Sequence, residues 1–134
     1  MLLKRVKQKH RNGCFIAAAA CACGISYDEM RKRLFPKEVA SGKKFHHALP
    51  GGSNIVNVLK RLGLKASASH DRNIREMKKP ALLVVEWSDV DNRGRGHCLV
   101  WDPKKKVIHD PAWKRPLSFY TYESQLSVVI YFSR

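Results

Sequence analysis

The spacing of hydrophobic residues along the chain is helical in the first half and strand-like in the second. Residues 14–23 form an alanine-rich apolar run that stops at Gly24, which predicts a short buried helix with glycine at its C-terminus. The tetrapeptide Ser26-Tyr27-Asp28-Glu29 is typical of a capping box. It predicts a second helix that runs through Leu34 and is stopped by Pro36.

A third helix is predicted after Ser53, because apolar residues then recur at helical spacing until Gly63. Beyond it the pattern changes to short apolar and β-branched runs, which predict strands. These strands are expected at residues 81–87, 97–102, 107–110 and 126–132. The chain therefore predicts an α+β fold in which N-terminal helices pack on one side of a C-terminal antiparallel β-sheet.

Length and composition limit this picture to one folded domain. The chain has 134 residues, enough for one hydrophobic core, and we expect residues 1–134 to form a single domain. Hydrophobic residues make up 44% against 28% charged residues, which excludes a disordered chain. Residues 14–23 provide about half of the ~20 apolar residues that a membrane span needs. Because no signal peptide is readable at the N-terminus, we expect a cytoplasmic protein, with secretion as an effector left open.

The chain is strongly basic, with 26 Lys and Arg against 11 Asp and Glu and a net charge of +15. Such a charge is compatible with an acidic peptide substrate, with nucleic acid or with solubility alone. Trp113, Tyr120 and Tyr122 are aromatic residues of the kind that stack on bases. Nucleic-acid binding is nevertheless not favoured, because the sequence has no recognition helix, zinc finger or RNA-binding sheet motif.

The four cysteines do not form the paired CxxC motifs of a zinc site, so we expect neither a metal nor a cofactor. Cys21 and Cys23 lie within the apolar run and are interpreted as buried structural residues. Cys14 instead opens the predicted helix, where unpaired backbone N–H groups and the helix dipole stabilise a thiolate. The basic residues 9–11 are expected to lower its pKa further, so Cys14 is the candidate nucleophile.

A candidate base for Cys14 lies in the predicted hairpin. A four-residue turn at residues 102–105 would place His97 directly opposite Asp110, on the same face of the sheet. The carboxylate of Asp110 would then fix the tautomer of the imidazole, whereas a three-residue turn would shift the pairing by one residue. Gln8 precedes Cys14 by six residues, and its amide is a candidate hydrogen-bond donor to an oxyanion, together with the Cys14 N–H.

Four motifs together resemble the papain-like cysteine peptidases, and most closely the bacteriocin-processing double-glycine leader peptidases. They are Gln8, Gly13-Cys14-Phe15, Gly96-His97-Cys98-Leu99-Val100 and Ile108-His109-Asp110-Pro111. The resemblance implies that Gln8 is the oxyanion donor, Cys14 the nucleophile, His97 the base and acid, and Asp110 the residue that orients the histidine. Gly13 and Phe15 depart from the usual leader peptidase pattern and are closer to papain itself.

The resemblance implies hydrolysis of a peptide or protein substrate, without a cofactor, through an acyl-enzyme. Glutamine deamidation and acyl transfer pass through the same intermediate and stay open as alternatives on the same four residues. The alternative of a different class is a basic nucleic-acid-binding or interaction domain without catalysis. The sequence makes no prediction of the oligomeric state.

Overall fold

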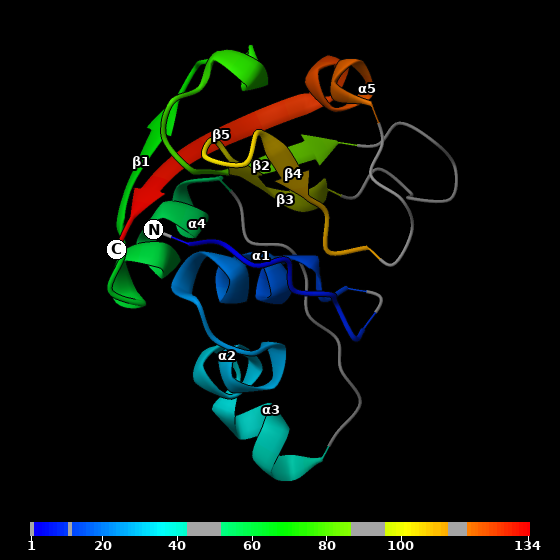
Figure 1. Cartoon of the computed structure of the whole chain (residues 1–134). Helices are drawn as coiled ribbons and strands as arrows, with labels where there is room; N and C mark the ends of the chain where they lie inside the picture. The colour runs from blue at the N-terminus through cyan, green and yellow to red at the C-terminus, as the bar shows by residue number, and fades with distance from the viewer. Residues whose placement is uncertain (1, 11, 43–51, 87–95, 113–117) are drawn as a thin grey trace.

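The computed structural model describes residues 2–10, 12–42, 52–86, 96–112 and 118–134 (Figure 1). Its helices are α1 (Cys14–Cys23), α2 (Tyr27–Leu34), α3 (Pro36–Ser41), α4 (Gly52–Arg61), the short 3-10 helix η1 (Ile74–Glu76) and α5 (Phe119–Ser124). Its strands are β1 (Lys65–Ser69), β2 (Ala81–Glu86), β3 (Gly96–Asp102), β4 (Val107–His109) and β5 (Leu126–Ser133). No helix within these ranges is long and apolar enough to cross a membrane.

The first two helices begin and end as their sequences predict. Gly24 adopts a left-handed conformation with φ of 72°, and its N–H bonds to the carbonyls at the end of α1. The Ser26 hydroxyl accepts the N–H of Glu29 at 3.1 Å and caps α2. Pro36 does not only end α2, because it also begins α3, where a missing N–H costs no hydrogen bond.

The five strands form one antiparallel sheet in the order β1-β5-β2-β3-β4. The sequence analysis missed β1, whose residues Lys65–Ser69 are small or polar, and α5, which interrupts the run of strands before β5. β1 pairs only with β5, so it is an edge strand that needs little hydrophobic character. Trp87, the last residue of the strand expected at 81–87, lies outside the described residues.

Both faces of the sheet carry a hydrophobic core. One face packs against α1, α2 and α4 through alternate residues such as Val84 and Cys98. The opposite face packs against η1 and α5, where Phe119 lies edge-on to Trp101 with ring centroids 5.8 Å apart. Figure 1 shows α1, α2 and α3 below the sheet and α5 above it. The N-terminal helices α1, α2 and α4 therefore pack on one side of the sheet as expected, and η1 and α5, which were not predicted, shield the second apolar face from water.

The β3–β4 hairpin differs from the predicted register by two residues. Asp102 pairs with Val107 and Val100 pairs with His109, so the turn comprises residues 103–106 instead of 102–105. Asp102 stays in the strand and its carboxylate accepts the N–H groups of Lys104 and Lys105 at 3.1 and 3.2 Å. Asp110 is consequently not directly opposite His97. Since a shift of two residues preserves the alternation of side chains, the two residues still share one face of the sheet.

Candidate active site

Cys14 is the first residue of α1, and α1 packs directly on β3. Gly13 precedes it because the hydroxyl of Tyr27 occupies the space that a side chain at residue 13 would need. The structure places Cys14 in the core with 7% of its surface exposed. The packing of α1 on β3 brings this thiol next to His97 and Cys98.

The surroundings of Cys14 favour a thiolate. Hydrogen bonding from the Cys98 thiol is the largest effect that lowers the pKa of Cys14, burial opposes it, and His97 reinforces it. The net result holds the pKa well below the ordinary range of a cysteine. The pKa of Cys14 is lowered, as the sequence analysis predicted. The main cause is the hydrogen bond from Cys98 on β3 and not the basic residues before the helix. The sequence analysis missed Cys98 in this role.

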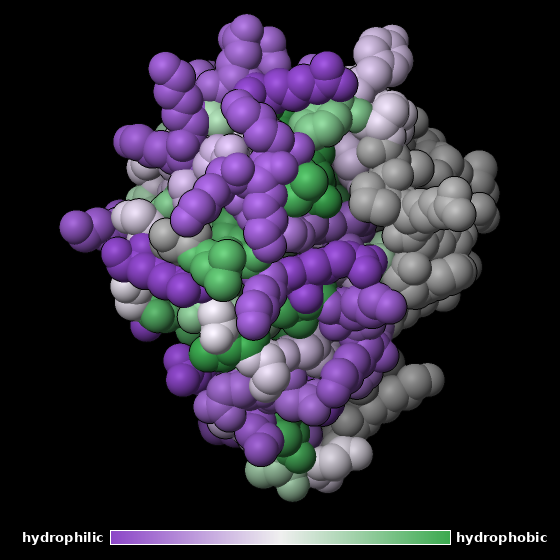
Figure 2. Space-filling view, in the orientation of Figure 1, coloured by the Kyte–Doolittle hydropathy of each residue, from purple (hydrophilic) through white to green (hydrophobic). Residues whose placement is uncertain are grey.

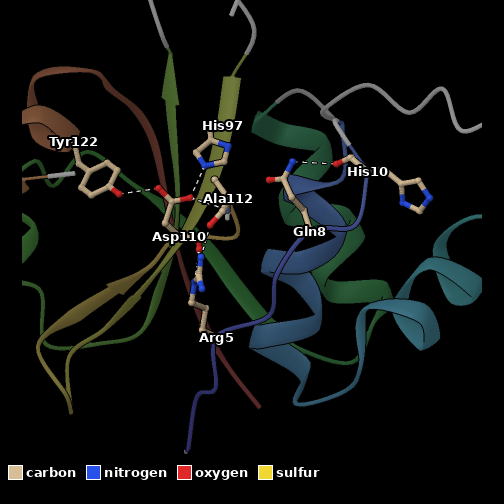
Figure 3. Close-up of polar contacts among 7 residues, drawn as sticks. All are labelled: Arg5, Gln8, His10, His97, Asp110, Ala112 and Tyr122. Atoms are coloured by element: carbon tan, nitrogen blue, oxygen red, sulfur yellow. Dashed lines mark hydrogen bonds and ion pairs between the residues drawn. The ribbon is translucent and has the colours of Figure 1, made fainter. Parts of the chain in front are cut away.

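His97 is hydrogen-bonded to Asp110, as predicted, with 2.7 Å between Nε2 and Oδ1 (Figure 3). Because Nε2 faces the carboxylate, Nδ1 is the nitrogen that is left to face Cys14. Burial by itself lowers the pKa of His97, but the hydrogen bonds to Asp110 and Cys14 outweigh it and raise the pKa to about 9. A depressed thiol pKa beside a raised imidazole pKa favours a thiolate–imidazolium pair at neutral pH.

Asp110 is held from several directions. Its Oδ1 accepts the N–H of Ala112 at 2.9 Å as well as His97, and its Oδ2 accepts the Tyr122 hydroxyl at 2.7 Å (Figure 3). Burial raises the pKa of Asp110, but the bonds from His97 and Tyr122 outweigh burial and lower it, so the carboxyl is ionised. Tyr122 is completely buried in α5, which corrects its interpretation as a base-stacking residue. Tyr120, from the same set, is 81% exposed, and Trp113 lies outside the described residues.

Gln8 lies on the N-terminal segment that runs beside α1, and Figure 3 shows its amide near His10. Its Nε2 donates to the His10 carbonyl at 3.0 Å, and its backbone N–H donates to the Pro111 carbonyl at 2.9 Å. The second of these bonds joins the segment to the loop that begins at Asp110. An amide nitrogen carries two hydrogens, so donation to His10 is compatible with a second donation. Its role as an oxyanion donor stays a prediction.

Solved structures of peptidase domains have this fold, whereas no protein-family model and no curated protein sequence matches the chain. The peptidase domain of Streptococcus ComA, a bi-functional ABC transporter of a quorum-sensing pathway, superposes with a TM-score of 0.65 at 16% identity over 98% of each chain. A double-glycine motif protease from an AMS/PCAT transporter, solved with a leader peptide, gives a TM-score of 0.57 at 15% identity. That match covers 98% of this chain and 91% of the other. The chain has the fold of these peptidase domains.

A second histidine–aspartate pair provides an internal comparison. His109 Nε2 lies 3.1 Å from Asp102 Oδ2, and Asp102 also binds the turn of the hairpin. The charge of Asp102 also acts on the thiol of Cys21. Burial, followed by this charge, raises the pKa of Cys21 to about 12. A raised pKa keeps the Cys21 thiol neutral, and a neutral thiol is a poor nucleophile. Within the described residues, no group of three His, Cys, Asp or Glu side chains is placed to hold a metal ion.

Proposed function

We propose that the chain is a cysteine peptidase in which Cys14 is the nucleophile, His97 the general base and acid, and Asp110 the residue that orients His97. We further propose that Gln8 and the Cys14 N–H bind the oxyanion, and that residues 1–134 act as one domain. The observation that carries the proposal is the chain of contacts from the Cys14 sulfur through His97 to Asp110. The fold shared with two peptidase domains supports the same reading.

In the proposed reaction, the Cys14 thiolate attacks the carbonyl carbon of the scissile amide, and the carbonyl π-electrons move to oxygen. The resulting oxyanion is bound by hydrogen-bond donors at the start of α1, where the first backbone N–H groups of a helix have no intrahelical partner. When the tetrahedral intermediate collapses, protonated His97 gives its proton to the leaving amine and the C–N bond breaks.

Hydrolysis then completes the cycle. Neutral His97 takes a proton from water as the water oxygen attacks the thioester carbon. The C–S bond breaks, a carboxylic acid leaves, and the thiolate–imidazolium pair forms again. Asp110 stays ionised throughout because it is hydrogen-bonded on both oxygens. Its negative charge stabilises the imidazolium in each half of the reaction.

A peptide is the proposed substrate, since the double-glycine motif protease from an AMS/PCAT transporter was solved in complex with the leader peptide. Glutamine deamidation and acyl transfer need the same four residues and differ in the group that leaves or accepts. Assays of fragment formation, ammonia release and transfer to an added amine separate the three reactions. Fragment formation without ammonia release is the expected outcome.

The deciding experiment compares wild type with Cys14→Ser and with Cys21→Ser in the same helix. Each protein is incubated with a mixture of cellular peptides, products are identified by mass spectrometry, and thiols are labelled with iodoacetamide between pH 6 and 7. We expect new peptide termini and rapid labelling of Cys14 in wild type, and both in Cys21→Ser, because Cys21 is a protonated, buried thiol. Selective labelling of Cys21 or Cys98 with Cys14 inert would refute the assignment.

A further inference from the structure

Arg5 joins the N-terminal segment to the loop that carries Asp110. Its Nε donates to the Asp110 carbonyl at 2.6 Å, and its Nη2 donates to the Ala112 carbonyl (Figure 3). The two acceptors flank Pro111 and lie two residues apart. A guanidinium can bind two such carbonyls at once because its donors form a rigid planar fork, whereas a lysine ammonium is a single point charge.

This loop depends on contacts from outside the sheet. β4 ends at His109, and Pro111 has no N–H to continue the ladder of hydrogen bonds. The carbonyls of residues 110, 111 and 112 accept instead from the N-terminal segment, through Arg5 at both ends and the Gln8 N–H in the middle. The carboxylate of Asp110 is meanwhile bound to His97 and Tyr122, so the two sides of the loop have separate supports.

We propose that Arg5 is a positioning residue of this site, a role that rests on the proposed peptidase function. Its fork holds the N-terminal segment in register with residues 110–112 and thereby fixes where Gln8, three residues further on, presents its amide. Gln8 acts on the oxyanion, which exists only during the reaction, so loss of Arg5 slows catalysis and leaves substrate binding almost unchanged. Asp110 keeps its bonds to Tyr122 and Ala112 without Arg5 and continues to support His97.

The basic residues near the N-terminus differ in whether their charges are bound to other groups or exposed. Within residues 4–9, Arg5 is engaged with backbone carbonyls, and Lys9 pairs with Asp28 at 2.8 Å. The charges of Lys4 and Lys7 stay exposed on the surface. An effect of Arg5 on turnover is therefore an effect of geometry, and Lys4→Gln is the matched control for loss of one positive charge from the same segment.

The test is a double-mutant cycle with Arg5→Gln, Gln8→Ala and the combined variant. We expect Arg5→Gln to lower kcat about 10- to 100-fold, a part of the loss known for removal of an oxyanion donor, with KM within about twofold of wild type. In the Gln8→Ala background the same change has almost no further effect, because the residue through which Arg5 acts is gone. Arg5→Lys keeps the charge without the fork and does not rescue kcat, and Lys4→Gln behaves like wild type on a neutral peptide.

Two further measurements do not depend on turnover. Alkylation of Cys14 by iodoacetamide forms no oxyanion, so its rate and pH profile are expected to be unchanged in Arg5→Gln. Hydrogen exchange at the Gln8 backbone N–H is expected to become faster, because its bond to the Pro111 carbonyl loses its neighbour. Equal losses of kcat with and without Gln8, or unchanged exchange at Gln8, would overturn the role of Arg5. A wild-type protein that cleaves no peptide would instead overturn the proposed function, while hydrogen exchange still reports whether Arg5 holds the segment.

Discussion

The support that Asp110 gives to His97 makes a quantitative prediction for Asp110→Asn. The pKa of His97 rises from its ordinary value of 6.5 to about 9 although burial acts in the opposite direction. A rise of this size corresponds to about 3 kcal/mol in favour of the imidazolium, shared between Asp110 and Cys14. Asparagine still bonds to the ring but carries no negative charge. We therefore expect the pKa of His97 to fall by about one to two units in Asp110→Asn.

The assay is the pH dependence of kcat/KM, together with that of Cys14 alkylation. The proposed mechanism requires a Cys14 thiolate and a protonated His97, so activity should be lost at low pH as Cys14 is protonated and at high pH as His97 is deprotonated. In wild type the high-pH loss is expected near pH 9, where His97 titrates. In Asp110→Asn this limb moves to lower pH, and the maximum falls less than in His97→Ala, which has no base.

Asp102→Asn is the matched control, because Asp102 is also a buried aspartate paired with a histidine on the same hairpin. It is expected to weaken the turn and leave the pH profile of activity unchanged. An unshifted high-pH limb in Asp110→Asn, or an equal shift in Asp102→Asn, would show that Asp110 does not set the protonation of His97.

Two other predictions follow from the same geometry. Tyr122→Phe leaves a carboxylate oxygen of Asp110 without its buried donor, so urea unfolding at pH 7 should show a loss of about 1–3 kcal/mol, with Tyr120→Phe as the exposed control. The loss should shrink as the pH falls below the ordinary carboxyl pKa of 3.8, because the lowered pKa of Asp110 then adds less and less stability; a loss that stays the same at acid pH contradicts this account. If exposed Lys4 and Lys7 attract acidic substrates, changing both to Gln lowers kcat/KM for an acidic peptide and not for a neutral one, and 1 M salt, with a Debye length of ~3 Å, removes the difference. Equal salt dependence of the two peptides would leave this charge without a role in substrate choice.

The basic side chains of the described residues lie on several separate parts of the surface. Figure 2 shows hydrophilic side chains over much of one face, with smaller hydrophobic areas between them. Five basic residues, Arg72, Arg75, Lys78, Lys79 and Lys106, line two shallow hollows of about 490 and 480 Å³ together with three acidic or amide residues. Both hollows adjoin η1, and the first also adjoins the β3–β4 turn, at the end of β3 opposite His97. Part of the net charge of +15 therefore lies away from the candidate active site.

Much of the fold could be predicted from the sequence, because helix ends and buried strands are marked by residues that lie close together in the chain. The apolar run before Gly24 and the capping box at Ser26 specify α1 and the start of α2 without reference to the rest of the chain. The apolar strands β2 and β3 are visible because both of their faces are buried. β1 and α5 were missed because an exposed edge strand and a helix of six residues carry little hydrophobic periodicity.

The sequence by itself indicated the candidate catalytic residues: a cysteine at a helix start, and a histidine and an aspartate whose spacing in a hairpin puts them on one face. The tertiary structure alone decided how these residues are supported. Cys98 reaches Cys14 because α1 packs on β3, Tyr122 reaches Asp110 because α5 covers the opposite face, and Arg5 reaches the Asp110 loop across 105 residues of chain. Such supports involve hydrogen bonds between segments that are distant in sequence. Their partners depend on how helices and strands pack, and no local pattern of residues records that packing.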